Sequence, residues 1–287
     1  MYRSVLMRGG FSILVAVMIA ALSTTSVWAQ EGAAAGGDSA SQEAKTPENP
    51  LQLIQWMIEA EGGTKAYSNI ASRVLYGQLE MVGMGMTAKF TSWNAGSGMY
   101  RESMSLEGMG SFEQGRLGEI AWGNDPIQGG RLLEGVEEEM NFRSSKLHPL
   151  LRVEEDYKDM KFVGEVDVKG VSCWQLDMVS NSDQKESWFI RKDNHLSQRM
   201  KSTVEAPMVG KINMTMDTLD YREIDGVMIP HRIEIEQGPQ KMVMSIDRVE
   251  HNGEIQAAQF ALPDTIRKLV DQRRKREKAK EEGDSAG

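Results

Sequence analysis

The chain has 287 residues, with 42 acidic side chains against 33 Lys or Arg, and its formal net charge is −9. This acidic balance disfavours nucleic acid as a partner and provides no polybasic anchor for a membrane surface. A single cysteine, Cys173, excludes a disulfide within the chain, so the hydrophobic core must hold the fold together. Cys173 lies in an apolar stretch of strand character, which predicts a buried thiol rather than a nucleophile.

Residues 1–29 have the pattern of a signal peptide. Arg3 and Arg8 precede an apolar run at 11–22, and Val27-Trp28-Ala29 is a small-residue cleavage site. The run is shorter than the about 20 residues that a membrane-spanning helix needs. We therefore expect cleavage after Ala29, a periplasmic location, and a mature chain without a transmembrane span. An uncleaved anchor is the alternative.

The next segment, 30–48, is rich in Ala, Gly and Ser and predicts a flexible leader. Asn49-Pro50 is typical of a helix start, and Gly62-Gly63 of a helix end. Leu51, Ile54 and Ile58 recur at helical spacing between them. A helix over 51–61 is therefore predicted.

Beyond residue 70 the pattern changes to strands linked by turns rich in Gly, Asn and Asp. Helical spacing returns only over 131–156, where Pro149 predicts two short helices rather than one. From 161 to 249 the strands form successive hairpins, and one of them turns at Asp225-Gly226. Pro230, in the returning strand, predicts a sheet edge or a bend there. A charged helix over 265–282 is predicted at the end.

These elements predict an α+β fold. We expect a large curled antiparallel sheet, an incomplete β-barrel of about ten or eleven strands, with helices covering its concave side. The expected domain spans 49–264, and 265–287 form a charged C-terminal helix or tail.

Catalytic patterns find little support in the sequence. The four histidines, His148, His195, His231 and His251, lack the spacing of a zinc site, and a nucleophile elbow, a P-loop and a dinucleotide fingerprint are all missing. His195 and His251 lie beside Asn in predicted turns, which favours a surface position. We expect no catalytic residue, metal or cofactor; an unrecognised hydrolase is the alternative.

Methionine is the unusual feature, with 20 residues, several of them paired at strand spacing. Such pairs lie on one face of a strand, and flexible Met side chains suit partners of irregular shape. This pattern indicates either an ordinary hydrophobic core or an apolar cavity for a ligand. The candidate cavity residues are Met84, Met86, Phe90, Trp93, Trp122, Leu133, Trp188, Met214, Met216, Ile229, Met242 and Met244.

The order of several motifs resembles the LolA/LolB-like family of periplasmic lipoprotein carriers. The motifs are Glu61-Gly62-Gly63, IASRVLYG at 70–77, GEIAW at 118–122, FVGEVDVKGVSCWQLDM at 162–178, WFIRKDNHLSQRM at 188–200, DYREIDGVMIPHRIEI at 220–235 and FALP at 260–263. The likeness extends from about residue 50 to 264, and it depends on the order and spacing of motifs that are individually weak.

The resemblance implies an incomplete barrel, closed by helices, whose apolar cavity holds the acyl chains of lipids or lipoproteins. We therefore expect a monomeric, non-enzymatic carrier, with the helices at 51–61 and 131–156 as its lid. The alternative is an envelope protein-interaction or sensor module that uses the same fold without lipid transport.

Overall fold

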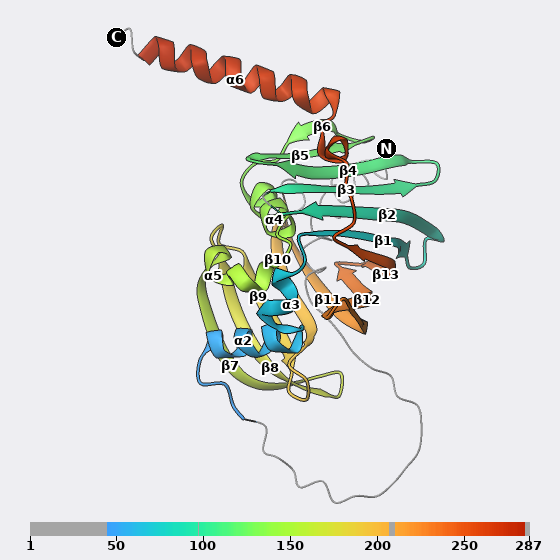
Figure 1. Ribbon diagram of the computed structural model, residues 1–287, viewed down its shortest axis with the longest axis vertical. Helices are drawn as coiled ribbons and strands as arrows, with labels where there is room; N and C mark the ends of the chain where they lie inside the picture. Colours follow the sequence, from blue (N-terminus) through green and yellow to red (C-terminus); the bar gives the residue numbers. More distant parts are fainter. Residues whose placement is uncertain (1–44, 97, 207–209, 285–287) are drawn as a thin grey trace, which may run out of the picture.

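The structure, a computed structural model, describes residues 45–96, 98–206 and 210–284 (Figure 1). The predicted signal peptide and most of the predicted leader lie outside these residues. Within them, no helix is both long and apolar enough to cross a lipid bilayer.

Thirteen strands form one antiparallel sheet, which is open rather than closed. They are β1 (Ser72–Met81), β2 (Met86–Ala95), β3 (Met99–Leu106), β4 (Gly110–Leu117), β5 (Ile120–Asp125), β6 (Gly129–Leu132), β7 (Tyr157–Val168), β8 (Val171–Ser180), β9 (Lys185–Arg191), β10 (Ser197–Ala206), β11 (Gly210–Ile224), β12 (Val227–Gln237) and β13 (Gln240–His251). In space their order is β6-β5-β4-β3-β2-β1-β13-β12-β11-β10-β9-β8-β7. The first and last strands thus pair at the middle of the sheet, and β6 and β7 are its edges.

The helices are α2 (Pro50–Ala60), α3 (Gly63–Ser68), α4 (Val136–Ser144), α5 (Val153–Asp156) and α6 (Asp264–Asp284), with 3-10 turns η2 (Pro149–Arg152) and η3 (Ala257–Phe260). In the curled sheet, α2 to α5 lie on one side (Figure 1), and their apolar residues join the main core cluster. We call the sheet face covered by these helices the inner face. The fold is therefore the α+β curled sheet that the sequence predicts.

The start of α2 shows why the sequence begins a helix there. Asn49 has an extended backbone, and its side chain accepts a hydrogen bond from the Gln52 amide at 2.9 Å. Pro50 lacks the amide hydrogen that a first helical residue would leave unpaired. Leu53, Ile54 and Met57 then face the sheet and are buried. The helix predicted over 51–61 is confirmed within one residue at each end.

The hairpin at Asp225-Gly226 joins β11 to β12, and both residues have positive φ, 52° and 78°. This is the geometry of the tight hairpin that the sequence predicts. Pro230 predicts that its strand lies at a sheet edge, and this is wrong, because β12 lies between β11 and β13. However, its pairing with β13 covers only Arg232–Gln237, so Pro230 has a ladder partner on the β11 side alone. A missing amide hydrogen is tolerated there.

The sheet has more strands than the ten or eleven predicted. Residues 129–132 form β6, although helical spacing was predicted from residue 131 onward. The short GGRL segment lacks alternation, and it becomes a strand because β5 provides a partner. The charged helix predicted over 265–282 is confirmed as α6, which extends away from the sheet (Figure 1).

Candidate ligand-binding face

The inner face carries an apolar cluster built from both halves of the sheet and from helices α2 to α5. Buried strand residues come from β1 to β4 on one side and from β7 to β9 and β11 to β13 on the other. Nine of its buried residues are methionines: Met57, Met81, Met104, Met140, Met178, Met214, Met216, Met242 and Met244. Because Met side chains change shape easily, this cluster is more adaptable than one of Leu and Ile.

Eight of the twelve predicted ligand-binding residues belong to this cluster or pack against it. They are Met86, Phe90, Trp188, Met214, Met216, Ile229, Met242 and Met244. The sequence pattern therefore placed most of them on a common face.

The other four predicted residues lie elsewhere, so their grouping with the rest is wrong. Met84 is 54% exposed in the turn between β1 and β2. Trp93 alternates with the buried inner residues Ser92 and Asn94, so it faces the opposite, outer side. Trp122 packs with Ile266 and Val270 of α6 in a second small cluster. Leu133 is buried after β6 but belongs to neither cluster.

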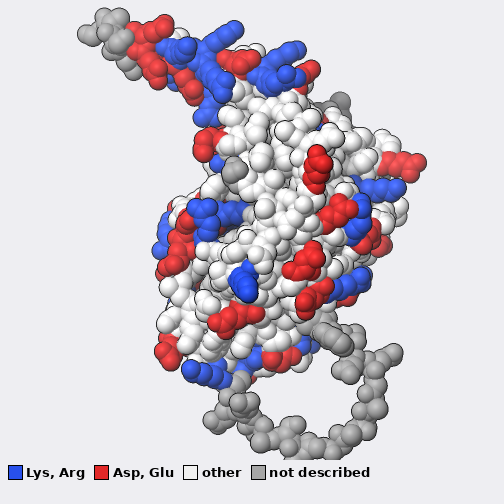
Figure 2. All heavy atoms as spheres, in the orientation of Figure 1, with Lys and Arg blue, Asp and Glu red and all other residues white. Residues whose placement is uncertain are grey.

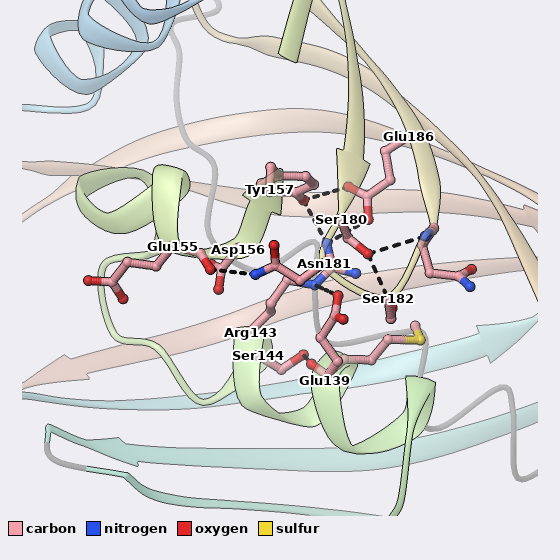
Figure 3. A network of polar contacts seen from close by, with 12 residues as sticks. Glu139, Arg143, Ser144, Glu155, Asp156, Tyr157, Ser180, Asn181, Ser182 and Glu186 are labelled. Carbon is pink, nitrogen blue, oxygen red and sulfur yellow. Dashed lines mark hydrogen bonds and ion pairs between the residues drawn. The ribbon is translucent and has the colours of Figure 1, made fainter. Parts of the chain in front are cut away.

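Helix α4 is held to the far half of the sheet by a buried ion pair (Figure 3). Arg143 donates to Glu186 of β9 at 2.6 Å and to the Tyr157 hydroxyl at 2.6 Å. Tyr157 in turn donates to Glu186 at 2.6 Å, and so does the indole of Trp188 at 3.1 Å. Burial opposes the charge of Arg143, but Glu186, Tyr157 and Glu139 together outweigh this effect and raise the pKa of the guanidinium. This network fixes the segment that links the two sheet edges.

A second anchor holds α2 and α3 to the hairpin at residues 225–226. The Tyr67 hydroxyl donates to the buried carboxylate of Glu61, and burial together with that carboxylate raises the pKa of Tyr67. The Met228 amide donates to the Glu61 carbonyl at 3.4 Å. A Cβ atom at Gly62 would overlap the Gly226 carbonyl oxygen, which shows how closely the two backbones approach.

His251 belongs to this region, and its predicted surface position is wrong. Its side chain is only 1% exposed, and its two ring nitrogens contact Asp225 at 3.0 Å and Arg73 at 3.1 Å. Burial lowers the pKa of His251, and the charge of Arg73 lowers it further. His195, the other histidine predicted at the surface, is half-buried and stacks on Trp56 of α2 with ring centroids 4.8 Å apart. Cys173 is fully buried as predicted, and burial raises the pKa of its thiol to about 11.

A group of buried polar residues on the inner face was not predicted. Ser92, Asn94, Tyr100, Glu102, Gln114 and Arg116 lie side by side on β2, β3 and β4. Glu102 accepts a hydrogen bond from Tyr100 at 3.1 Å, and burial raises its pKa to about 8. Glu102 is therefore protonated at neutral pH.

The arrangement of the potential metal-ligating side chains can be compared with that of a metal site. Over 45–96, 98–206 and 210–284, no three His, Cys, Asp or Glu side chains are grouped as metal ligands. Well-buried carboxylates there make direct ion pairs instead, such as Glu186 with Arg143, Asp156 with Lys146 and Asp217 with Arg199. These pairs join strands and helices to one another, as structural contacts do.

Comparison with known families and with curated proteins gives no sequence match. Solved structures do match. A DUF1329 family protein from Desulfovibrio piger has a TM-score of 0.53 at 12% identity, over 74% of this chain and 98% of its own. A LolA superfamily protein from Nitrosomonas europaea has a TM-score of 0.51 at 10% identity, over 75% and 98%.

A third match is a putative outer membrane lipoprotein-sorting protein domain from Vibrio parahaemolyticus, with a TM-score of 0.50 at 9% identity, over 74% of this chain and 95% of that one. At such low identities the likeness concerns the fold. The chain has a LolA-like fold.

Proposed function

We propose that this protein binds the acyl chains of lipids or lipoproteins between its sheet and helices α2 to α5, as a carrier without catalytic chemistry. The proposal rests mainly on the Met-rich cluster, which extends over both halves of the inner face. Residues 49–264 form the binding domain, and residues 1–29 direct the chain to the periplasm, where it acts as a monomer in outer-membrane lipoprotein sorting or lipid transport.

The affinity would come from apolar burial, at about 0.8 kcal/mol for each buried methylene group. Met214 and Met216 lie on β11 and Met242 and Met244 on β13, with β12 between these two strands. Ile235 of β12 is the cross-strand partner of both Met216 and Met242, and Ile233 is that of Met244. The flexible Met side chains can adjust to a chain of variable length and unsaturation. An aliphatic surface of this kind selects for acyl chains without fixing their identity.

The inner face is covered in this structure, because α2 and α4 pack directly on the cluster. An acyl chain must therefore displace a helix. The Arg143–Glu186 pair holds α4 to the sheet, and the hydrogen bond from the Met228 amide to the Glu61 carbonyl holds the end of α2. Breaking them would accompany loading, and re-forming them would accompany release.

A titration with a matched control tests this proposal. The delipidated mature protein is titrated with a fluorescent fatty acid, which palmitic acid then displaces. Trp188 packs against the cluster, whereas Trp93 lies on the outer face. Trp188→Ala should weaken binding about tenfold, which corresponds to about 1.4 kcal/mol, and Trp93→Ala should leave it unchanged. Native mass spectrometry should detect lipid that co-purifies with the protein.

Failure of the wild-type protein to take up the fatty acid, with no lipid in the purified sample, would refute the carrier function. Equal losses of fatty-acid affinity in the two tryptophan variants would show that the ligand does not bind at the inner face.

Partner binding through a sheet edge is the second candidate function, and β7 favours it. This edge strand has 12 residues, pairs only with β8, and exposes Val163. A free edge can accept a strand from another protein. Val163→Pro would remove one backbone donor from β7, so it should abolish partner capture while leaving fatty-acid uptake intact.

A further inference from the structure

Six polar side chains form a two-by-three grid on the inner face. In one row Asn94 of β2, Tyr100 of β3 and Arg116 of β4 are direct cross-strand partners. In the next row Ser92, Glu102 and Gln114 are partners in the same way. All six are buried. We call this set the polar grid.

The polar grid adjoins the apolar cluster without a gap. Two residues further along the same strands lie Phe90, Met104 and Phe112, which again form a cross-strand row. All three belong to the main cluster. The inner face of β2 to β4 is therefore amphipathic along its length, apolar at one end and polar at the other.

Helix α4 covers the polar grid. The Asn94 side chain donates to the carbonyl of Ser145, which ends the helix, at 2.9 Å. Arg116 lies over the ring of Phe142 at 4.5 Å. Asn141 is one helical turn before Ser145, so both lie on the helix face that meets the grid. Asn141 is only 2% exposed.

Several buried polar atoms here have hydrogen-bonding capacity that the described residues leave unused. Within the described ranges neither the oxygen nor the nitrogen of the Asn141 amide has a partner. The same holds for Glu102 Oε1, Asn94 Oδ1 and Arg116 Nη1. Folding normally satisfies buried polar atoms, because each unpaired one is costly. Five such atoms in one place indicate a function.

These atoms offer both donors and acceptors. Asn141 Nδ2 and Arg116 Nη1 are donors, and Glu102, protonated at neutral pH, can donate from the oxygen that Tyr100 does not contact. Asn94 Oδ1 and Asn141 Oδ1 are acceptors. A ligand that satisfies the set needs carbonyl oxygens and, close to them, a hydroxyl or N–H group.

We propose that the polar grid, closed by Asn141, binds the ester or amide linkage of an acylated ligand whose hydrocarbon chain lies along the adjoining row of Phe90, Met104 and Phe112. This inference rests on the proposed function and specifies its ligand class: acyl chains attached through a carbonyl beside a hydroxyl or N–H group. Acylglycerols and N-acylated peptides both have this chemistry.

Three probes of equal chain length separate the inference from the proposed function. Monopalmitoylglycerol carries an ester and hydroxyls, N-palmitoylglycinamide carries an amide, and hexadecane delivered from cyclodextrin carries no polar group. Each competes against a fluorescent fatty acid bound to the mature protein. The two probes with polar linkages should bind at least about tenfold more tightly than hexadecane. A preference between them would identify the source as glycerolipid or N-acylated peptide.

Three substitutions test the residues. Asn141→Leu and Glu102→Met replace polar atoms with apolar groups of similar size, and both should lower affinity for monopalmitoylglycerol about tenfold with hexadecane unaffected. Glu102→Gln keeps a neutral donor and acceptor, so it should bind within about threefold of wild type. Asn141→Leu should also raise the Tm, because two unpaired buried atoms are removed, whereas Glu102→Met should not, because it takes away the acceptor of the Tyr100 hydroxyl.

The outcomes are distinct. Binding of none of the probes would refute the proposed function itself. Equal binding of all three, or an equal loss for all three in Asn141→Leu, would refute the polar grid as a linkage site while the carrier function stands.

Discussion

Glu102 is a carboxyl group enclosed by the fold, with the Tyr100 hydroxyl as its hydrogen-bond donor. Burial raises its pKa to about 8, against an ordinary value of 4.5. The folded state therefore holds a proton that the unfolded state releases between these two values, so stability falls as the pH rises from 4.5 to 8 and then levels off. Each unit of the difference corresponds to about 1.4 kcal/mol.

Glu102→Gln should remove this pH dependence. The amide has no proton to lose, so urea denaturation at pH 5 and pH 8.5 should show a smaller loss of stability in the variant than in wild type. Identical pH profiles for the two proteins would mean that Glu102 ionises freely in the folded state.

The Arg143–Glu186 pair is a second buried charge system, and its two members are interdependent. Arg143→Met alone leaves Glu186 buried without its cation and should cost about 3–5 kcal/mol. Adding Glu186→Gln removes that charge but keeps an acceptor for Tyr157 and Trp188. The double variant should therefore be more stable than Arg143→Met in urea denaturation. Additive losses would show that the two side chains act independently.

Among the secondary-structure elements, the junction between α2 and α3 depends on one glycine. Gly62 has φ of 109°, and a side chain there would meet the Gly226 carbonyl. Gly62→Ala should thus separate the helices from the hairpin at 225–226, and we expect a loss of more than about 2 kcal/mol, measured by thermal unfolding.

Gly63 provides the matched control. Its φ is also positive, 80°, but a Cβ atom there meets no other atom within 4 Å. Gly63→Ala should therefore lower the free energy of unfolding through backbone strain alone, by about 1 kcal/mol. Equal losses at both positions would show that strain, rather than close approach, explains the effect.

The sequence predicts most elements because their signals are local. The Asn49-Pro50 start, the Asp225-Gly226 turn and the alternation in β7 to β13 require no knowledge of distant neighbours. β6 was missed because its strand character comes from β5 and not from Gly129 and Gly130. The surface position predicted for His251 failed because a turn residue can be covered by another segment, here Asp225 and Arg73.

At the scale of the whole molecule, α6 is nearly independent of the rest. Ile266 and Val270 pack on Trp122, but residues 271–282 are exposed, and Figure 2 shows Lys and Arg gathered along the projecting helix together with acidic side chains. Ending the chain after Gln272 should change stability by less than about 0.5 kcal/mol. Ile266→Ala, by contrast, should cost about 2 kcal/mol or more in the same denaturation experiment. A large loss on truncation would indicate a further contact of the distal helix.

The spatial arrangement of the strands is the part that the sequence does not reveal. Alternation places Met214 and Met216 on one face of their strand, but it does not say which face is covered. Trp93 and Trp122 were therefore assigned to the wrong side. The sequence does contain a sign of the polar grid. On each of β2, β3 and β4, the residues that share a face with Phe90, Met104 or Phe112 and lie two and four positions away are polar. Only the register of β2 to β4 shows that these three transitions coincide.

The pairing of β1 with β13 has a consequence for how the molecule forms. Arg73 and His251, partners in that pair, are 178 positions apart. The ribosome delivers β1 long before β13, so the emerging chain can assemble β1 to β6 and β7 to β12 only as two separate pieces. Each piece exposes its apolar face and an unpaired strand until the last strand arrives to join them. Such distant pairing slows folding and prolongs the time in which exposed apolar surface and unpaired strands can aggregate.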